Sequence, residues 1–278
     1  MDLDWINSIL YGSISGIADI LPVSAQAHKV LLLKFGGAKG EMDLLNLLIH
    51  IAITAALYYS TQTHIIRMNR ARALARVPKK KRKRPLDTRS LMDWSLLKTM
   101  VIPAILGLFL YRHTTSWSAN LMLLALFLFL NGVILYIPQF FPTSNKDSRT
   151  LSRVEGLLMG LGGMVSCVPG ISAMGAATSI GSVCGVERSF GLDMALMMNI
   201  VLNLGLAVYD AIGIANNGFG VLSAAIILRY ILTAACAFGG TVLGVKLMRR
   251  FAEGSGYALF GVYCWGLALF TFILNLVA

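Results

Sequence analysis

Charged residues are scarce in this sequence of 278 residues. Asp, Glu, Lys and Arg together make up 13% of the chain, whereas hydrophobic residues make up 56%. Soluble domains usually carry about 25% charged residues, so the composition excludes a disordered chain and argues against an ordinary soluble protein. Several apolar runs reach the roughly 20 residues that a membrane-spanning helix needs. The sequence therefore predicts an all-α polytopic membrane protein.

Signatures of zinc sites and nucleotide sites are missing as well. The four cysteines, Cys167, Cys184, Cys236 and Cys264, are scattered through apolar segments without CxxC or zinc-ligand spacing. Such cysteines are usually small core residues. Neither a GxxxxGK[ST] motif nor a GxGxxG motif between a strand and a helix is present, so nothing supports a nucleotide site.

Positive charge exceeds negative charge, with 24 Lys and Arg against 13 Asp and Glu. Much of the excess lies in the segment 61–93, which contains Pro78-Lys-Lys-Lys-Arg-Lys-Arg-Pro85. In a chain this apolar we interpret the segment as a solvated cytoplasmic loop beside anionic lipid headgroups. We expect no nucleic acid as a partner.

Two apolar stretches are interrupted near their centres. The stretch 6–36 is broken by Leu21-Pro-Val-Ser-Ala-Gln-Ala-His28, and the stretch 153–186 by Val168-Pro-Gly-Ile-Ser-Ala-Met-Gly175. Irregular backbone at membrane depth is tolerated only where it is buried in protein or lines a cavity. We therefore predict two re-entrant helical hairpins, with a proline-kinked spanning helix as the alternative for each.

Three predicted spans follow each hairpin. The first repeat, 1–141, holds the hairpin 6–36, the spans 44–60, 94–112 and 117–137, and the basic loop 61–93; the second repeat, 142–278, holds the hairpin 153–186 and the spans 190–214, 221–247 and 254–277. Because three crossings are an odd number, the two halves start from opposite faces of the membrane. This order predicts an inverted-topology repeat whose hairpin tips meet near the midplane, where such proteins bind their ligands.

The distribution of Lys and Arg predicts the orientation. With the loop 61–93 in the cytoplasm, the outer segments 1–5, 36–43, 113–118 and 215–220 contain one Lys and no Arg. Short loops rich in Lys and Arg stay on the cytoplasmic side. We therefore predict a multi-pass protein with the basic loop inside.

Ionisable side chains within apolar segments are costly and are candidates for function. Asp19 and His28 flank Pro22, and Ser24 and Gln26 lie between them. An acid, an imidazole and a hydroxyl around a helix break suit phosphate chemistry, in which the imidazole acts as acid or nucleophile and the carboxylate orients it or holds a divalent metal. A surface position for Asp19 and a purely structural role for His28 are the alternatives.

Further polar residues lie inside the predicted spans. They are His50, Asp193, Asp210, Asn46, Asn131, Asn199 and Asn203. Asn199 and Asn203 are four residues apart and are equally explained by bonds between helices. We interpret Asp210, near the outer end of its span, as interfacial.

The two helix breaks resemble the motifs of a known family. Gly16-Ile-Ala-Asp-Ile-Leu-Pro-Val-Ser-Ala-Gln-Ala-His28 resembles the motif E-G-x-T-E-F-L-P-V-S-S-x-G-H of bacterial undecaprenyl-diphosphate phosphatases. Pro169-Gly-Ile-Ser-Ala-Met-Gly-Ala176 resembles their second motif, P-G-x-S-R-S-G-A-T, and Gly185-Val-Glu-Arg188 fits the G-V-x-R that follows. The resemblance covers nearly the whole chain. It implies the inverted-repeat fold, the bacterial cytoplasmic membrane and removal of one phosphate from undecaprenyl diphosphate.

The resemblance also implies roles for individual residues. Asp19, His28 and Ser24 become the catalytic candidates, and Asp19 the candidate ligand of a divalent cation, Mg²⁺ or Ca²⁺. The candidates for binding the substrate are Ser172, Gly170, Gln26, Asn46, Thr178 and Arg188.

Several motif positions depart from the family pattern. Ser15 stands in place of the first Glu, Ala25 in place of the second Ser, and Ala173 in place of the Arg. An Arg would clamp phosphate through two parallel hydrogen bonds, and Lys29 and Arg188 are the candidates to compensate for its loss. Two functions stay open: a variant-site phosphatase, or a non-hydrolytic transporter (flippase) of polyprenyl phosphate in which the hydrolytic site has degenerated. Both take a polyprenyl phosphate or diphosphate lipid as partner, and the sequence does not indicate an oligomeric state.

Overall fold

The computed structural model describes residues 4–36, 43–142, 145–219, 222–254 and 256–277. Across these residues the regular structure is helical, apart from one isolated bridge between Lys146 and Val186. The α-helices are α1 (Trp5–Ile20), α2 (Ala25–Gly36), α3 (Asp43–Ala75), α4 (Thr88–Thr114), α5 (Leu121–Tyr136), α6 (Arg153–Met164), α7 (Ala173–Val183), α8 (Arg188–Asn217), α9 (Ala224–Glu253) and α10 (Ala258–Val277). The prediction of an all-α protein is confirmed.

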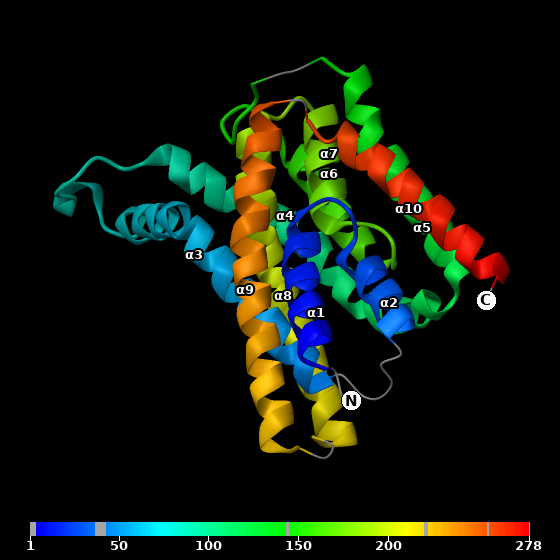
Figure 1. Cartoon of the computed structure of the whole chain (residues 1–278). Coiled ribbons are helices and arrows are strands. Elements are labelled where there is room, and N and C mark those ends of the chain that lie inside the picture. Colours follow the sequence, from blue (N-terminus) through cyan, green and yellow to red (C-terminus); the bar gives the residue numbers. More distant parts are fainter. Residues whose placement is uncertain (1–3, 37–42, 143–144, 220–221, 255, 278) are drawn as a thin grey trace.

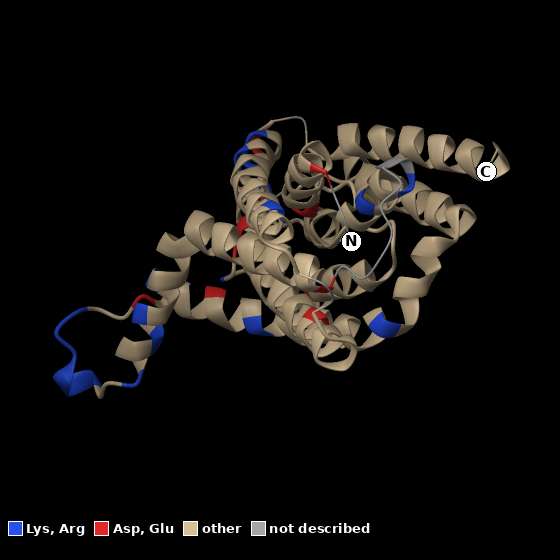
Figure 2. Ribbon diagram, turned by 60° about the horizontal axis from the view of Figure 1, so that its bottom comes forward, with Lys and Arg blue, Asp and Glu red and all other residues tan. Residues whose placement is uncertain are grey.

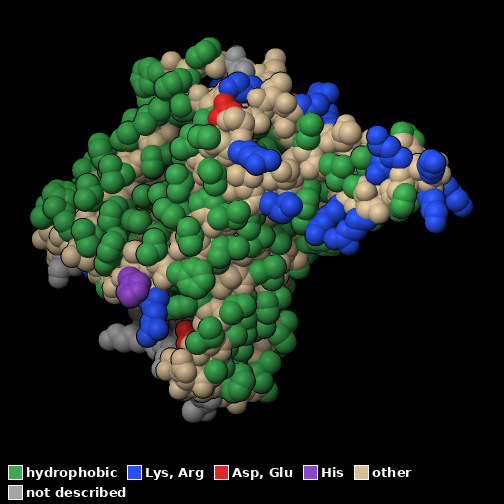
Figure 3. All heavy atoms as spheres, turned by 180° about the vertical axis from the view of Figure 1, so that it is seen from behind, with side chains coloured by type: hydrophobic (Ala, Val, Ile, Leu, Met, Phe, Trp, Pro, Cys, Tyr) green, Lys and Arg blue, Asp and Glu red, His purple; other side chains and the backbone are tan. Residues whose placement is uncertain are grey.

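Six helices in the described part of the chain are long and apolar enough to cross a bilayer. They are α3, α4 with its short extension to Ala119, α5 with its extension to Phe140, α8, α9 and α10. Hydrophobic side chains cover most of the face shown in Figure 3, whereas basic side chains gather on one projection. A soluble protein rarely exposes so large an apolar surface. The chain is therefore a multi-pass membrane protein.

Both interrupted stretches form two short helices that fold back on each other. α1 ends at Ile20, directly before Leu21 and Pro22, since a residue that precedes proline is disfavoured in a helix. The turn continues through Ser24, whose φ of 65° is unusual for a residue other than glycine. α1 packs against α2, and α6 against α7, so each stretch is a hairpin and not a kinked helix. The depth that each hairpin reaches in the bilayer stays a prediction.

Helices from the two halves of the chain pack against each other in matching pairs. α1 lies against α9 and α6 against α4, while α3 pairs with α8 and α5 with α10 (Figure 1). α1 approaches α9 closely because Gly12 and Gly16 face its backbone, where an added Cβ would collide with carbonyl oxygens. An inverted repeat would produce these same pairs, and the repeat itself stays a prediction.

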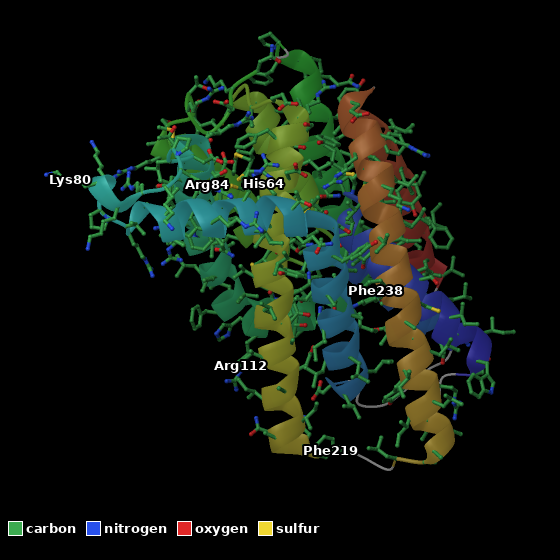
Figure 4. All side chains as sticks on the ribbon, turned by 90° about the vertical axis from the view of Figure 1, so that its left-hand side faces the viewer. His64, Lys80, Arg84, Arg112, Phe219 and Phe238 are labelled. Carbon is green, nitrogen blue, oxygen red and sulfur yellow. The ribbon has the colours of Figure 1, made fainter. Side chains whose placement is uncertain are left out.

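The segment 61–93, predicted as a loop, is largely helical. α3 continues to Ala75 and α4 begins at Thr88, so the two helices project sideways from the bundle as an arm (Figures 1 and 2). Residues 61–75 are rich in Ala and Arg, which favour helix, and Asp87 caps α4 by accepting a hydrogen bond from Ser90 N. Lys80 lies at the end of the arm (Figure 4), where Lys and Arg gather (Figure 2).

An ionic cluster lies where the arm leaves the bundle. Arg249 donates to Asp193 at 3.2 Å, and His64 lies between Asp193 and Asp93, 3.1 Å from an Asp93 oxygen (Figure 4 labels His64). Asp93 also accepts a hydrogen bond from Ser148. The cluster joins α3, α4, α8 and α9, so Asp193 has a structural place outside the cavity described below.

Candidate functional site

A cavity of about 260 Å³ lies where the two hairpins meet α3, α4 and α8. Its lining is Tyr11, Ala18, Asp19, Ser24, Ala25, Gln26, Lys29, Val30, Leu33, Asn46, His50, Tyr111, Thr115, Ser166, Ile171, Ser172, Ala173, Asn199, Leu202, Leu206 and Asp210. Polar and charged side chains thus share one space with aliphatic ones, in a protein whose outer surface is apolar.

Asn131 joins the tips of the two hairpins. Its amide nitrogen donates to the carbonyl oxygen of Pro22 at 2.9 Å, and its amide oxygen accepts from Ser172 N at 3.0 Å. Gly175 lies directly against Pro22, because a Cβ added there would lie 2.8 Å from the proline Cβ. The two breaks therefore touch, and one fully buried amide on α5 holds their backbones together.

Each hairpin presents a serine at the start of its second helix. Ser24 precedes α2 and its hydroxyl accepts from Ala27 N at 3.4 Å, while Ser172 precedes α7 and accepts from Gly175 N at 3.2 Å. Both serines line the cavity, so the N-terminal ends of two helices converge on it. Unpaired N–H groups at a helix start attract anions. Lys29, one turn into α2, adds an ammonium group to the same wall.

Asp19 is held by two amides of α8. Asn199 Nδ2 donates to Asp19 Oδ2 at 2.8 Å, and Asn203 Nδ2 donates to the same oxygen at 3.1 Å. Asn203 also donates to the carbonyl oxygen of Asn199. These bonds fix the carboxylate at the end of α1 and leave its other oxygen free of a described hydrogen bond. Bonds between helices, the alternative explanation of the asparagine pair, do exist, and they fix a cavity residue.

His50 and Asp210 form a second polar group in the cavity. His50 Nδ1 lies 2.8 Å from Asn203 Oδ1, and His50 Nε2 lies 3.8 Å from Asp210 Oδ2. Asp210 is buried within the protein, with 7% of its surface exposed, and its Oδ2 has no hydrogen-bond partner. Its interfacial position in the membrane stays a prediction. Nearby, Tyr11 donates to Asn46 at 3.3 Å.

Five of the predicted site residues line the cavity, and four do not. The five are Asp19, Ser24, Gln26, Asn46 and Ser172. His28 lies on another face of α2: its Nδ1 donates to Ser24 O at 2.8 Å, its Nε2 accepts from the hydroxyl of Tyr263 at 2.7 Å, and its ring stacks on the Tyr263 ring. The reason is helical periodicity, since Gln26, Lys29 and Leu33 share one stripe of α2 and position 28 falls beside it.

The other three residues have structural surroundings. Thr178 donates to the carbonyl oxygen of Met174 one turn back. Gly170 turns the chain with a φ of 102° against α5, a conformation that side chains rarely adopt. Arg188 donates to the carbonyl oxygen of Gly254 in the loop that joins α9 and α10. Their predicted contacts with substrate have no counterpart in the cavity lining.

Sequence reasoning missed part of the lining. Tyr11 and Tyr111 were not candidates, and Lys29, His50 and Asp210 were noted without a place in the site. Two spacings could have found His50 and Asp210: Asn46 and His50 are four residues apart on α3, and Asn199, Leu206 and Asp210 follow one stripe of α8. What the sequence could not supply was which stripe faces the hairpins.

For the predicted divalent cation, the residue named from the sequence, Asp19, lines this cavity. The described residues contain no group of three or more His, Cys, Asp and Glu side chains that could hold a metal ion. Asp19 supplies one free oxygen, and phosphate oxygens of a substrate would have to complete the coordination, as they often do for Mg²⁺. The cation stays a prediction, and no step below passes through it.

Fold and cavity together define a class. This is a polytopic α-helical membrane protein in which two broken hairpins meet tip to tip beside a buried, partly charged cavity. Residues 8–270 match the family described as "Bacitracin resistance protein BacA". The chain belongs to this family, which confirms the resemblance of the two motifs.

Relatives from several organisms align with nearly the whole chain. A protein of Methanobrevibacter smithii named undecaprenyl-diphosphatase is 24% identical over 277 residues, which cover 98% of both chains. A protein of Shouchella clausii named undecaprenyl-diphosphatase 1 is 25% identical over 281 residues, covering 96% of this chain and 95% of its own. A protein of Nocardioides sp., also named undecaprenyl-diphosphatase, is 24% identical, and the alignment covers 98% of this chain and 97% of its own.

Proposed function

We propose that this protein hydrolyses undecaprenyl diphosphate, or a similar polyprenyl diphosphate, to the monophosphate and inorganic phosphate. The observation that carries the proposal is the convergence of Ser24, Ser172 and Lys29 on one cavity at the starts of α2 and α7. The names of the relatives, undecaprenyl-diphosphatase, support the substrate class.

The cavity has groups that suit a diphosphate headgroup. Backbone N–H groups at the two helix starts and the serine hydroxyls can donate to phosphate oxygens. Where the family motif has an Arg, this chain has Ala173. Lys29 and Ala173 both line the cavity, so Lys29 can supply the positive charge that the Arg would have supplied. Lys binds phosphate as a point charge rather than as a bidentate clamp. The variant site therefore keeps a cation, delivered from the other hairpin.

The aliphatic part of the lining suits the first isoprenoid units. Val30, Leu33, Leu202, Leu206 and Ile171 lie in the same cavity as the polar groups. A lipid diphosphate has a strongly charged head joined to an apolar chain, and a site between transmembrane helices accommodates both. This mixed lining favours a lipid over a free, small phosphate compound.

Asp19 is suited to positioning within this site. Its carboxylate is fixed by two amides of α8 and lies at the end of α1, directly before the turn that leads to Ser24. Phosphoryl transfer depends mostly on positioning and on neutralising charge. A fixed carboxylate can orient the attacking water or hold a cation against the diphosphate oxygens.

The experiment that tests the proposal measures release of inorganic phosphate from undecaprenyl diphosphate by the purified protein in detergent, with Mg²⁺ or Ca²⁺ present. We expect release that depends on Asp19, with Asp19→Asn strongly impaired and the exposed Glu253→Gln unchanged. Phosphate release by the wild type that is no greater than the residual release by Asp19→Asn would overturn the proposal. If such a protein also moved polyprenyl phosphate across liposome membranes, the flippase alternative would take its place.

A further inference from the structure

We infer that His50 and Asp210 form a water-activating pair that accepts a proton during hydrolysis, in place of the imidazole that the family motif supplies at His28. The inference rests on the proposed function and deepens it.

The asparagines of α8 determine which nitrogen of His50 carries the hydrogen. Asn203 Nδ2 donates to Asp19 Oδ2 at 3.1 Å and to Asn199 O at 3.1 Å, so its amide oxygen faces His50. An amide oxygen accepts only, hence His50 Nδ1 is the donor at 2.8 Å. In a neutral imidazole the other nitrogen, Nε2, then carries a free lone pair.

That lone pair faces a second acceptor. Asp210 Oδ2 lies 3.8 Å from His50 Nε2, is buried, and has no hydrogen-bond partner. A buried carboxylate oxygen without a donor is costly. A separation of 3.8 Å is too long for a direct hydrogen bond, but a water oxygen about 2.8 Å from each atom would donate one hydrogen to each.

Charges of both signs face the pair. Asp19 from α1, Lys29 from α2, Asp43 at the start of α3, and the hydroxyls of Tyr11 and Tyr111 act on this part of the cavity. Among the ionisable lining residues, two carboxylates stand against one ammonium group, and a diphosphate adds further negative charge. Burial and the Lys29 ammonium group oppose an imidazolium at His50, whereas Asp210, Asp19 and the phosphate oxygens of a bound headgroup favour it. The bound diphosphate is therefore what makes proton uptake by His50 favourable.

The oxygen of the bound water forms a bond to the terminal phosphorus, and one of its protons passes to His50 Nε2. The bond between that phosphorus and the bridging oxygen breaks, and its electron pair leaves with the polyprenyl monophosphate. Asp210 then stabilises the imidazolium, which returns the proton to an oxygen of the departing inorganic phosphate, so that His50 is neutral again. His28, bonded to Tyr263 outside the cavity lining, takes no part.

The pH profile of phosphate release from undecaprenyl diphosphate tests the pair, with wild type, His50→Gln, Asp210→Asn and the exposed His113→Gln as matched control. We expect kcat of His50→Gln to fall roughly 10²–10⁴-fold, the usual contribution of a general base. The decline of the wild-type rate toward acidic pH should disappear in the residual activity of this variant. His113→Gln should match the wild type at every pH.

A purely structural role would give a different pattern. It would lower the thermal unfolding temperature of His50→Gln, and it would lower the rate of this variant by the same factor at every pH. Added imidazole would not restore activity to His50→Ala. That result, with an active wild type, overturns the pair while the proposed hydrolysis stands. A wild type that releases no phosphate overturns both. Rescue of His50→Ala by imidazole, together with loss of the acidic decline, supports the pair.

Discussion

Asn131 Nδ2 lies 2.9 Å from the carbonyl oxygen of Pro22, and the same side chain accepts from Ser172 N. One buried amide thus ties together two backbone breaks that are about 150 residues apart in sequence, and both breaks border the cavity. A helix break inside an apolar protein leaves backbone groups without partners. Asn131 satisfies one such group in each hairpin.

Replacing this amide should loosen both tips. Asn131→Leu keeps a similar volume but leaves Ser172 N buried without a partner, at roughly 1–3 kcal/mol. Pro22 O keeps only the weak hydrogen bond from Cys264 Sγ at 3.7 Å. We expect a lower unfolding temperature in detergent and a lower rate of phosphate release. Asn69→Leu, at an exposed position on the arm, is the control. An unchanged unfolding temperature for Asn131→Leu would contradict the bridging role.

The contact between the hairpin tips leaves no room for a methyl group. In Gly175→Ala the new Cβ would lie 2.8 Å from the Cβ of Pro22, so the tips must separate. We expect loss of activity greater than loss of stability, because the separation changes the cavity first. Gly266→Ala is the matched control, since nothing lies within 4 Å of its added Cβ. There the change should raise the free energy of unfolding by up to about 1 kcal/mol, because Ala favours a helix more than Gly does. Equal behaviour of the two variants would count against tip contact.

Lys29 is the cation in the cavity lining, and its removal should weaken binding of the diphosphate. For Lys29→Met we expect kcat/KM to fall roughly 10–100-fold, as for loss of a hydrogen bond to a charged group. Lys98→Met, exposed on α4, should leave kcat/KM unchanged. In the double variant Lys29→Met with Ala173→Arg, the family arginine should restore part of the activity. A fully active Lys29→Met would show that the headgroup binds elsewhere.

His28 lies outside the cavity lining, so its replacement should have a small effect. For His28→Gln we expect the rate to stay within about tenfold of the wild type, or below about 1.4 kcal/mol in activation free energy. The comparison is Asp19→Asn, which should lose far more. If His28→Gln were as inactive as Asp19→Asn, the motif imidazole would act directly, and the role given to His50 would be lost.

A divalent cation would bind with Asp19 and the diphosphate oxygens. We expect EDTA to abolish phosphate release and added Mg²⁺ or Ca²⁺ to restore it, because the two carboxylates and the diphosphate exceed the single ammonium group in the cavity. The apparent affinity for the metal should fall in Asp19→Asn. Full activity in EDTA would remove the cation from the mechanism.

The motifs identified part of the site, and periodicity could have identified more. Asp19, Ser24 and Ser172 follow from the breaks because a break fixes where a helix ends and the next begins. His28 follows from the resemblance alone, and the structure turns it toward Tyr263. The basic segment shows a similar limit: its charge is evident from sequence, whereas its helical arm depends on Asp87 as a cap and on Arg72 stacking on Trp94 at 4.8 Å.

By itself, the sequence determined that the protein lies in a membrane and that two interrupted apolar stretches form helical hairpins. A low charge content, six long apolar runs and two proline-centred interruptions leave few other solutions, since a bilayer requires every backbone group to find a partner within the protein. Only the tertiary structure decided which faces meet. Asp19 at the end of α1 reaches Asn199 and Asn203 of α8, about 180 residues away in sequence. His50 reaches Asp210 because α3 and α8 pack against each other. Composition and motif spacing do not encode the rotation of one helix about its axis against another, so the polar pairs inside the cavity emerge only from packing.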